Sequence, residues 1–444
     1  MKKMSMKKIF LFALSLVLSF AATTASAQDT GVNSPFSRYG IGLLSNQAQG
    51  FNSGMAGLAY GMRNGRELNF KNPASYSAID SLTFLFDMGV SLQNGNFSTG
   101  KASTNARNAS FEYLSMGFRI NRGFGMSIGL MPVSNIGYNT SSEGTAFDGG
   151  ITGDVTPTVT YTGSGGLREV YAGLGYAPVK PISFGVNVGY MWGVMNHVAT
   201  NSYTDPNVQS LNRAYSSEVR TYKIDAGLQW AQRVGKNNSF VLGLSYGLGH
   251  KIPGSSYLFN QRILNSAVLA VDTLTAHNAW SIPHTFGGGL TWQYRNKLRV
   301  GVDYNQQLWS KANQPQLFTT PNGQNTYKAT KDGYCDTKRY TIGMEYVNDP
   351  EGLKWADRVR YHAGFSYGNN YTKIMGSKAP NTYLATIGAA FPIINIYNNR
   401  TFINVSAQYE RVKPQVAGQI TENYFRLCLG ITFNERWFMK WKVE

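Results

Sequence analysis

The chain has 444 residues, of which 15% are charged and 13% are aromatic, and its formal net charge is +17. The charged fraction is well below the roughly 25% of an ordinary soluble domain, which argues against a soluble globular fold. The basic excess does not indicate nucleic-acid binding, because the sequence has no Lys/Arg cluster of that type. We expect these charges to contact anionic lipid headgroups or to lie in solvated loop ends.

Residues 1–27 have the pattern of a secretory signal peptide. Four lysines precede an apolar stretch at residues 9–22, and the small residues at 25–27 form a cleavage site. No later stretch has about 18 consecutive apolar residues, so the sequence predicts no further transmembrane helix. We therefore expect an exported chain whose mature part begins near Gln28.

Residues 28–80 are rich in Gly, Ser and Asn and show no strand-like alternation. Apolar residues such as Phe36, Ile41 and Leu58 are nevertheless more frequent than a disordered tail would contain. The sequence therefore predicts a hatch that folds inside a barrel, and a tail hanging in the periplasm is the alternative.

Residues 81–444 contain short segments in which apolar and polar residues alternate. In a strand this pattern gives one apolar face and one polar face, as a barrel wall between lipid and a polar lumen requires. The expected strands lie near residues 81–94, 110–120, 123–131, 166–177, 181–195, 217–231, 238–249, 283–294, 297–310, 336–347, 357–368, 381–392, 400–411 and 422–433.

The connections between these segments alternate in length. Residues 121–123 and 178–180 are tight turns, whereas residues 139–165, 251–281 and 311–335 are long polar stretches. Outer-membrane barrels have short periplasmic turns and long extracellular loops. The sequence thus predicts an all-β fold, a monomeric transmembrane antiparallel β-barrel of about 14 strands in the outer membrane. An aromatic and basic tail at residues 434–444 is expected to anchor it at the membrane interface, or to extend the last strand and supply an aromatic insertion signal for barrel assembly.

Several short motifs resemble those of a known family. Residues 53–59 (Ser-Gly-Met-Ala-Gly-Leu-Ala), then residues 70–74 (Phe-Lys-Asn-Pro-Ala) and a strand, resemble the N-terminal hatch of the FadL-type outer-membrane transporters. Further landmarks similar to the Bacteroidetes branch of that family lie at residues 34–40, 129–132, 163–166 and 282–284. The resemblance implies passive uptake of hydrophobic molecules, such as long-chain fatty acids, with sideways release through a gap beside the third strand.

The resemblance also implies site residues. Asn72, Pro73 and Ala74 would form a hatch turn that moves when a ligand binds; the alternative is a rigid turn that leads into the first strand. The third strand is expected to end at Pro132, which cannot donate to the ladder. Gly129 and Gly137 loosen the same stretch, so these three residues are candidates for a lateral gate; an ordinary strand end is the alternative.

Charged residues of both signs occupy expected lumen positions. They are Asp87, Arg119, Arg299, Asp303, Glu345, Arg360 and Arg426, together with Lys223, Asp225, Arg339 and Glu410. Mixed signs favour a structural network that pairs with itself and with the hatch over an ion-selective pore. The arginines would also be able to hold a carboxylate of a fatty acid through charge-assisted bonds.

The sequence gives no support for catalysis or for a cofactor. It contains neither a GxSxG nor an HExxH motif, and no nucleotide-binding motif. Cys335 and Cys428 lie outside any CxxC motif, so a metal or redox site is not predicted. We expect a protein that is not an enzyme, in contact with membrane lipid and a hydrophobic small molecule.

A second function stays open at this point. Barrels that resemble this family also serve as accessory subunits of type IX secretion, where they bind a protein partner and conduct nothing. An apolar lumen pocket open to the outside would favour the transporter. A filled lumen together with an exposed apolar patch on the loops would favour the accessory subunit. An open polar channel would indicate a nonspecific porin.

Overall fold

The computed structural model describes residues 32–100, 102–148, 154–205, 207–265, 267–374, 376, 378–393, 401–416 and 418–435. The predicted signal peptide and residues 436–444 of the predicted tail lie outside these residues.

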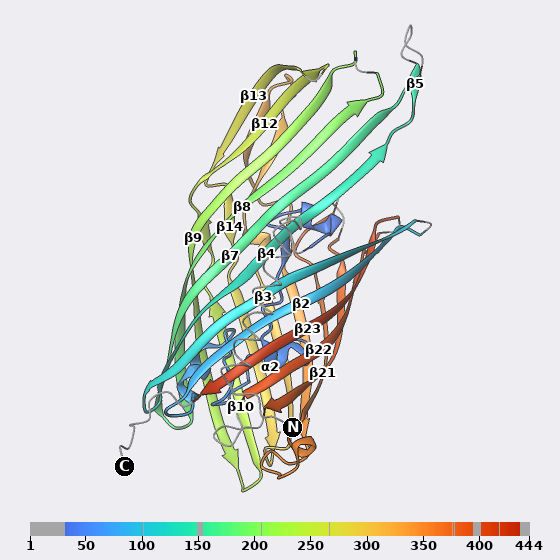
Figure 1. The fold of residues 1–444 in the computed structure, drawn as a ribbon. Helices are drawn as coiled ribbons and strands as arrows, with labels where there is room; N and C mark the ends of the chain where they lie inside the picture. The colour runs from blue at the N-terminus through green and yellow to red at the C-terminus, as the bar shows by residue number, and fades with distance from the viewer. Residues whose placement is uncertain are drawn as a thin grey trace, which may run out of the picture.

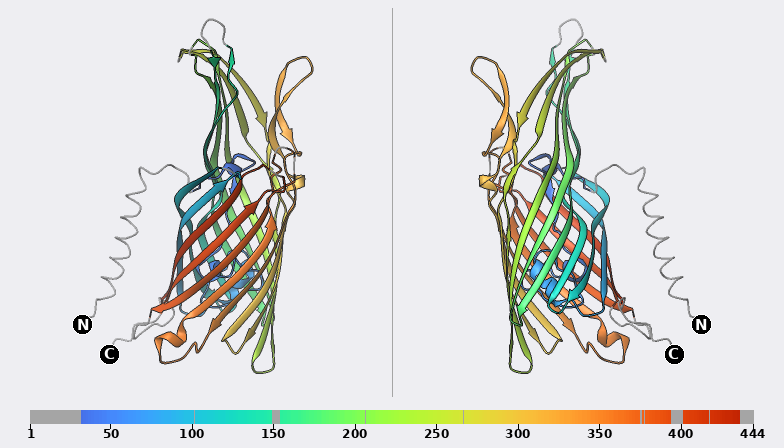
Figure 2. Two further views of the ribbon diagram at one scale, coloured as in Figure 1. Left: turned by 90° about the vertical axis from the view of Figure 1, so that its right-hand side faces the viewer. Right: turned by 90° about the vertical axis from the view of Figure 1, so that its left-hand side faces the viewer.

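Fourteen antiparallel strands close into one barrel (Figures 1 and 2). They are β2 (Phe84–Ser98), β3 (Ser103–Asn121), β4 (Phe124–Glu143), β7 (Pro157–Val179), β8 (Ile182–Tyr203), β9 (Ser210–Val234), β10 (Asn238–Gly247), β15 (Thr285–Tyr294), β16 (Leu298–Gln307), β19 (Thr337–Val347), β20 (Arg360–Asn369), β21 (Asn381–Ile393), β22 (Thr401–Lys413) and β23 (Thr421–Glu435). β23 pairs with β2 along its whole length, which closes the sheet. The predicted fold class is confirmed.

The apolar face of each strand lies on the outside of the barrel. On β8, for example, the side chains of Phe184, Val186 and Val188 are 51%, 44% and 55% exposed, while Ser183 and Asn187, at alternate positions, are buried. A soluble sheet would show the reverse. This arrangement matches a wall with lipid outside and polar side chains inside.

One side of the barrel rises far above the other on the extracellular side (Figure 1). β4, β7, β8 and β9 continue past the barrel and are joined there by β12 (Ser255–Leu264) and β13 (Ala267–His277). Three small pairs complete this region: β5 (Phe147–Asp148) with β6 (Asp154–Val155), β11 (His250–Ile252) with β14 (Trp280–Ile282), and β17 (Gln314–Thr319) with β18 (Asn325–Thr330).

This tall wall corrects the expectation of long polar loops. Residues 139–143 and 157–165 belong to β4 and β7, and residues 255–264 and 267–277 form a hairpin. Outside the membrane both faces of a strand contact water, so the hydrogen-bond ladder continues while the apolar alternation stops. Alternation alone therefore located only the parts of these strands that face lipid.

β3 and β4 separate part-way up the barrel wall (Figure 1). Their ladder reaches only as far as the Leu114–Leu130 pair, above which β4 pairs with β7 and β3 pairs with β2. The expectation that the third strand ends at Pro132 is wrong, because β4 runs through it to Glu143 with a bulge between Pro132 and Ser134. The bulge accommodates the proline, which has no N–H to donate to the ladder, and the pairing with β7 resumes beyond it.

Residues 32–80, called here the N-terminal segment, lie inside the barrel (Figure 2). The segment contains η2 (Pro35–Arg38), β1 (Leu43–Leu44), α2 (Gly50–Ser53) and η3 (Pro73–Ala78), and further short turns η5 (Trp309–Lys311) and η6 (Trp355–Arg358) lie between strands. In the described part of the chain, no helix has the length and apolar character needed to cross a membrane.

Candidate functional site

The predicted hatch turn joins the N-terminal segment to the barrel wall. Asn72 caps η3 by accepting a hydrogen bond from the Ala74 amide at 3.3 Å. Its side-chain amide donates to the carbonyl of Tyr60 at 2.8 Å and reaches the carbonyls of Leu228 and Leu244 at 3.3 and 3.4 Å. One buried side chain thus fixes the turn to the segment and to two strands.

Glycines on the wall leave the space that this turn occupies. A Cβ on Gly185 would overlap the backbone of Pro73, and a Cβ on Gly227 would overlap the side chain of Asn72. A Cβ on Gly243 would likewise overlap the carbonyl of Tyr60. The strands therefore lack side chains where the backbone of the segment approaches them.

Buried carboxylates hold other parts of the segment. Asp303 accepts hydrogen bonds from the amides of Ala59 and Tyr60 at 2.6 and 3.0 Å. Asp87 accepts from the hydroxyl of Tyr113 at 2.9 Å, and that hydroxyl in turn accepts from the Gly50 amide at 2.6 Å. Both predicted lumen charges therefore face the segment, directly or through one side chain.

Three of the predicted lumen charges meet in one buried ion cluster. Arg360 lies 2.7 Å and Arg299 3.3 Å from the carboxylate of Glu67, and the two arginines lie 3.9 and 3.7 Å from Glu345. The Nε2 atom of His362 lies 3.1 Å from Glu345. Two carboxylates share two guanidinium groups here, so the cluster is closely balanced in charge.

Sequence reasoning missed Glu67, the member of this cluster that comes from the segment. The available signal was an acid, Glu67, in a segment that the sequence places inside the barrel, where arginines are expected on the lumen face. Arg426 lies elsewhere and pairs with Glu410, and Arg119 lies at the periplasmic end of β3, where it donates to the Asn121 carbonyl.

Near the lateral-gate candidates, the N-terminal segment pairs with the edge of β4 that is no longer paired with β3. β1 pairs with β4 through Leu43–Asn135 and Leu44–Ser134. The carbonyl of Pro132 accepts from the Gln47 side chain at 3.4 Å, and the carbonyl of Gly137 accepts from the Ser34 amide at 2.8 Å. Gly129 lies below this region, against the ring of Tyr171.

The extracellular end of the lumen is filled by an aromatic cluster. The ring of Trp309 lies 4.3 Å from that of Tyr371 and 5.4 Å from that of Tyr334, measured between centroids. All three side chains are buried and pack with Ile41 of the segment. The hydroxyl of Tyr371 donates to the carbonyl of Gly42 at 2.6 Å, so the loops and the segment are joined at this end of the lumen.

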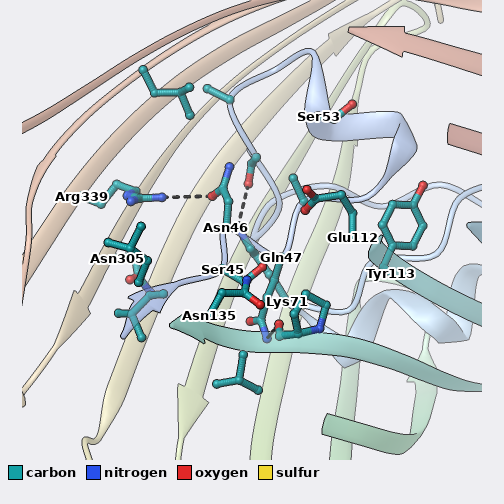
Figure 3. Close-up of a pocket in the computed structure, with 18 of the residues that line it drawn as sticks. Ser45, Asn46, Gln47, Ser53, Lys71, Glu112, Tyr113, Asn135, Asn305 and Arg339 are labelled. Atoms are coloured by element: carbon teal, nitrogen blue, oxygen red, sulfur yellow. Dashed lines mark hydrogen bonds between the residues drawn. The ribbon is translucent and has the colours of Figure 1, made fainter. Parts of the chain in front are cut away.

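A cavity of about 320 Å³ remains between these closures (Figure 3). The guanidinium of Arg339 donates to Asn46 at 3.0 Å, and the ammonium of Lys71 reaches the Gly57 carbonyl at 3.3 Å. Burial, reinforced by the nearby charge of Arg339, lowers the pKa of Lys71 to about 8, although Asp303 opposes this shift. The cavity is therefore polar on this side, where Lys71, Arg339 and Asp303 line it.

The opposite side of the same cavity reaches the membrane face of the barrel. Its lining includes Val90, Phe111 and Leu429, which are 42%, 41% and 40% exposed on the outer surface. They lie on β2, β3 and β23, next to the place where β3 and β4 separate.

Both cysteines, Cys335 and Cys428, are free thiols.

A model of the BamG family matches residues 5–444 of the sequence. The chain belongs to the BamG family. Among curated proteins, no relative matches it.

Solved structures of several outer-membrane barrels share the fold of this BamG-family chain. A *Pseudomonas aeruginosa* FadL homologue has a TM-score of 0.58 at 12% identity, covering 88% of this chain and 98% of its own. The CymD monoaromatic hydrocarbon channel has a TM-score of 0.57 at 14% identity, covering 87% of this chain and 97% of its own. The Ralstonia pickettii toluene transporter TbuX has a TM-score of 0.55 at 13% identity, covering 86% of this chain and 97% of its own. The resemblance to FadL-type barrels is confirmed for the fold, which is that of an outer-membrane β-barrel.

Proposed function

We propose that the chain is a non-conducting outer-membrane barrel that serves as an accessory subunit and binds a protein partner on its extracellular side. The N-terminal segment, which lies inside the barrel and is bonded to its wall, carries this proposal. The ion cluster around Glu67, the turn at Asn72 and the aromatic cluster around Trp309 each join the N-terminal segment to the wall or to loops. A solute would have to displace buried, paired polar groups, which is costly.

The tall extracellular wall offers a surface for such a partner. In the β12–β13 hairpin, Val268, Leu269 and Val271 are 54%, 51% and 54% exposed. This hairpin stands above the barrel, beyond the lipid-facing part of the strands (Figure 1). An apolar group exposed outside the membrane supports contact with another protein.

A second candidate function is the passage of small hydrophobic molecules with lateral release. The separation of β3 from β4 and the cavity that reaches Val90 and Phe111 favour it. In this case β1 and the Asn72 turn would act as a moving hatch. Because TbuX and CymD are named for toluene and monoaromatic hydrocarbons, toluene is the first substrate to test, and a long-chain fatty acid is the second.

A disulfide across β1 and β4 separates the two functions. Leu44 and Ser134 are direct partners in this antiparallel pair, a geometry that a disulfide can bridge. Leu44→Cys with Ser134→Cys would be made in a background where Cys335 and Cys428 are serine. If the proposal is correct, the oxidised and reduced proteins bind the same partner to the same extent, and neither admits toluene into liposomes. Uptake that oxidation abolishes and reduction restores would contradict it.

Native mass spectrometry of the protein purified in mild detergent provides the binding measurement. We expect a protein partner at fixed stoichiometry, and Val268→Ser with Val271→Ser is expected to lower its occupancy several-fold. Leu353→Ser is the matched control, because Leu353 is 95% exposed but lies in the β19–β20 connection at the periplasmic end. A stoichiometric apolar small molecule without any protein partner would favour the transporter instead.

A further inference from the structure

Four tyrosines form a row across the outer face of the barrel. They lie on neighbouring strands β16, β19, β20 and β21, each directly opposite the next in the ladder: Tyr304, Tyr340, Tyr367 and Tyr383. The ring centroids are 5.1 Å apart in the first pair and 5.1 Å apart in the last pair. Arg411 of β22 continues the row beyond Tyr383 and is exposed.

A polar row lies one outward position closer to the extracellular end. Its members are Gln306, Lys338, Asn369, Asn381 and Lys413, joined by strand pairing and by the bond from the Lys338 amide to Asn369. The two lysines are exposed. Lys338 and Lys413 lie three strands apart, about 14 Å at the usual strand spacing. The side-chain amides of Asn369 and Asn381 lie on the two strands between them, and that of Gln306 lies on the strand next to Lys338.

The cations of this region are not neutralised by the nearest acids. Glu410, next to Arg411 in the chain, points into the lumen and pairs with Arg426. Asp336, two residues from Lys338, accepts a hydrogen bond from the Ser310 amide. On the opposite wall, by contrast, the exposed Arg220 of β9 pairs with Glu218 on the same strand.

An apolar row lies one outward position closer to the periplasm. Val302, Ile342, Phe365, Ala385 and Tyr409 face one another across the same five strands. The outer face therefore changes from apolar to aromatic to amide and cationic within five residues of each strand. This order crosses the boundary between the acyl chains and the headgroups of the outer leaflet.

We propose that the outer face of β16–β22 binds a phosphorylated glycolipid of the outer leaflet. The acyl chains lie on the apolar row, and the sugar rings lie over the tyrosines, whose flat faces suit their C–H surfaces. The side-chain NH2 groups of Gln306 and Asn381 donate to sugar hydroxyls, while Asn369 holds the strands together through its bonds to the backbone. Phosphates bind at Lys338 on one side and at Arg411 and Lys413 on the other.

The spacing favours a headgroup with two separated anions over an ordinary phospholipid. A phospholipid brings one phosphate and no sugar ring, so it would use one cationic end and leave the amides between unoccupied. An aromatic girdle alone would need neither the cations at both ends nor the amides. This site is separate from the lumen and from the β12–β13 hairpin, so it does not depend on the proposed function.

Native mass spectrometry of the full mature protein in detergent tests the proposal, with three probes: diphosphorylated lipid A, monophosphorylated lipid A and phosphatidylglycerol. The wild-type protein is expected to prefer them in that order by several-fold at each step. Arg411→Gln with Lys413→Gln is expected to weaken binding of diphosphorylated lipid A roughly tenfold and to remove its advantage over the monophosphorylated form. Tyr367→Leu with Tyr383→Leu keeps the surface apolar and should weaken both forms of lipid A but not phosphatidylglycerol.

Lys338→Gln, on another strand, should reproduce part of the loss even if the double variant folds poorly, and heat-modifiable gel migration checks folding. Lys236→Gln with Lys297→Gln is the control, because both lysines are exposed in periplasmic turns. Equal binding of lipid A by wild type and the folded variants would overturn the proposal. Phosphatidylglycerol binding as tightly as lipid A, or a partner protein that cross-links along the tyrosine row and excludes lipid A, would overturn it as well.

Discussion

The N-terminal segment is held at the two ends of the lumen by different chemistry. At the ion cluster, Arg299 and Arg360 meet Glu67 and Glu345, and all four side chains are largely removed from water. At the extracellular end, the aromatic cluster packs against Ile41 and is joined to the segment by few polar contacts. Charge holds one closure, whereas apolar contact holds the other.

This difference predicts how each closure responds to change. Removing one member of a buried ion cluster leaves an uncompensated charge, which costs several kcal/mol. Removing one polar atom from an apolar cluster leaves the packing intact and costs much less. We therefore expect substitutions near Glu67 to release the segment from the wall, and substitutions near Trp309 to loosen it only locally.

Arg299→Met should have the largest effect. It leaves Glu67 and Glu345 sharing one arginine, Arg360, with His362 beside Glu345, and the expected loss is about 3–5 kcal/mol in the free energy of unfolding. Urea unfolding of the barrel in lipid vesicles, followed by tryptophan fluorescence, measures it. Arg119→Met is the control, because Arg119 lies outside the cluster and donates only to the Asn121 carbonyl. Similar losses in the two variants would contradict the distinction between the closures.

Gly185→Ala tests the close approach of backbones at the Asn72 turn. The added methyl group overlaps Pro73, so the turn must shift, and overpacking of this kind costs about 1–3 kcal/mol. The measurement is protease cleavage of the segment in the folded barrel, which should become faster. Gly288→Ala is a matched change in another strand, where the new methyl group would lie 3.5 Å from Leu244. If both variants resist protease like the wild type, the turn is not fixed by this contact.

Lys71 predicts a dependence on pH. Its pKa is lowered to about 8, so above pH 8 the folded protein loses a proton that the unfolded chain keeps until its usual pKa of 10.5. The unfolded state then binds more protons, so stability rises as the pH increases from 8 toward 10. Arg339 and Asp303 are the charged groups that act on Lys71.

The expected gain between pH 7.5 and pH 9.5 is about 1–2 kcal/mol, reduced from the full shift because Lys71 is only partly buried. Lys71→Met should be more stable than the wild type at pH 7.5 and should lack the rise, while Lys71→Arg stays charged and should also lack it. If the stability of Lys71→Met also rises between pH 7.5 and pH 9.5, groups other than Lys71 cause the rise.

The sequence predicted the parts of the fold that lipid dictates. Every strand facing lipid needs alternating apolar residues, so positions such as Phe184, Val186 and Val188 revealed β8 and its outward face. The same parity predicts lumen positions for Arg299, Asp303 and Glu345, which are buried in the structure. Water and the lumen impose no such pattern, so the extracellular parts of β4 and β7 looked like loops.

Contacts between distant segments left no periodic signal. The β1–β4 pair exists because β3 leaves β4 above Leu130, and two residues are too short to show a strand pattern. Trp309 and Tyr334 come from the connection between β16 and β19, Tyr371 comes from that between β20 and β21, and the three meet only in the folded barrel. Motifs located the Asn72 turn, but whether that turn moves depends on bonds to Leu228 and Leu244 that sequence does not display.

Tyr371→Phe should have the smallest effect and probes the apolar closure directly. The ring keeps its contact with Trp309, and the bond from the hydroxyl to the Gly42 carbonyl is lost, at a cost of about 1 kcal/mol. Hydrogen exchange should increase at residues 39–44 and stay unchanged around Glu67, because the ion cluster holds its own part of the segment. Tyr334→Phe is the control, since the described structure gives the Tyr334 hydroxyl no hydrogen-bond partner. Faster exchange along the whole segment in Tyr371→Phe would mean that the two closures act as one, and the lumen would then open as a unit when either end is disturbed.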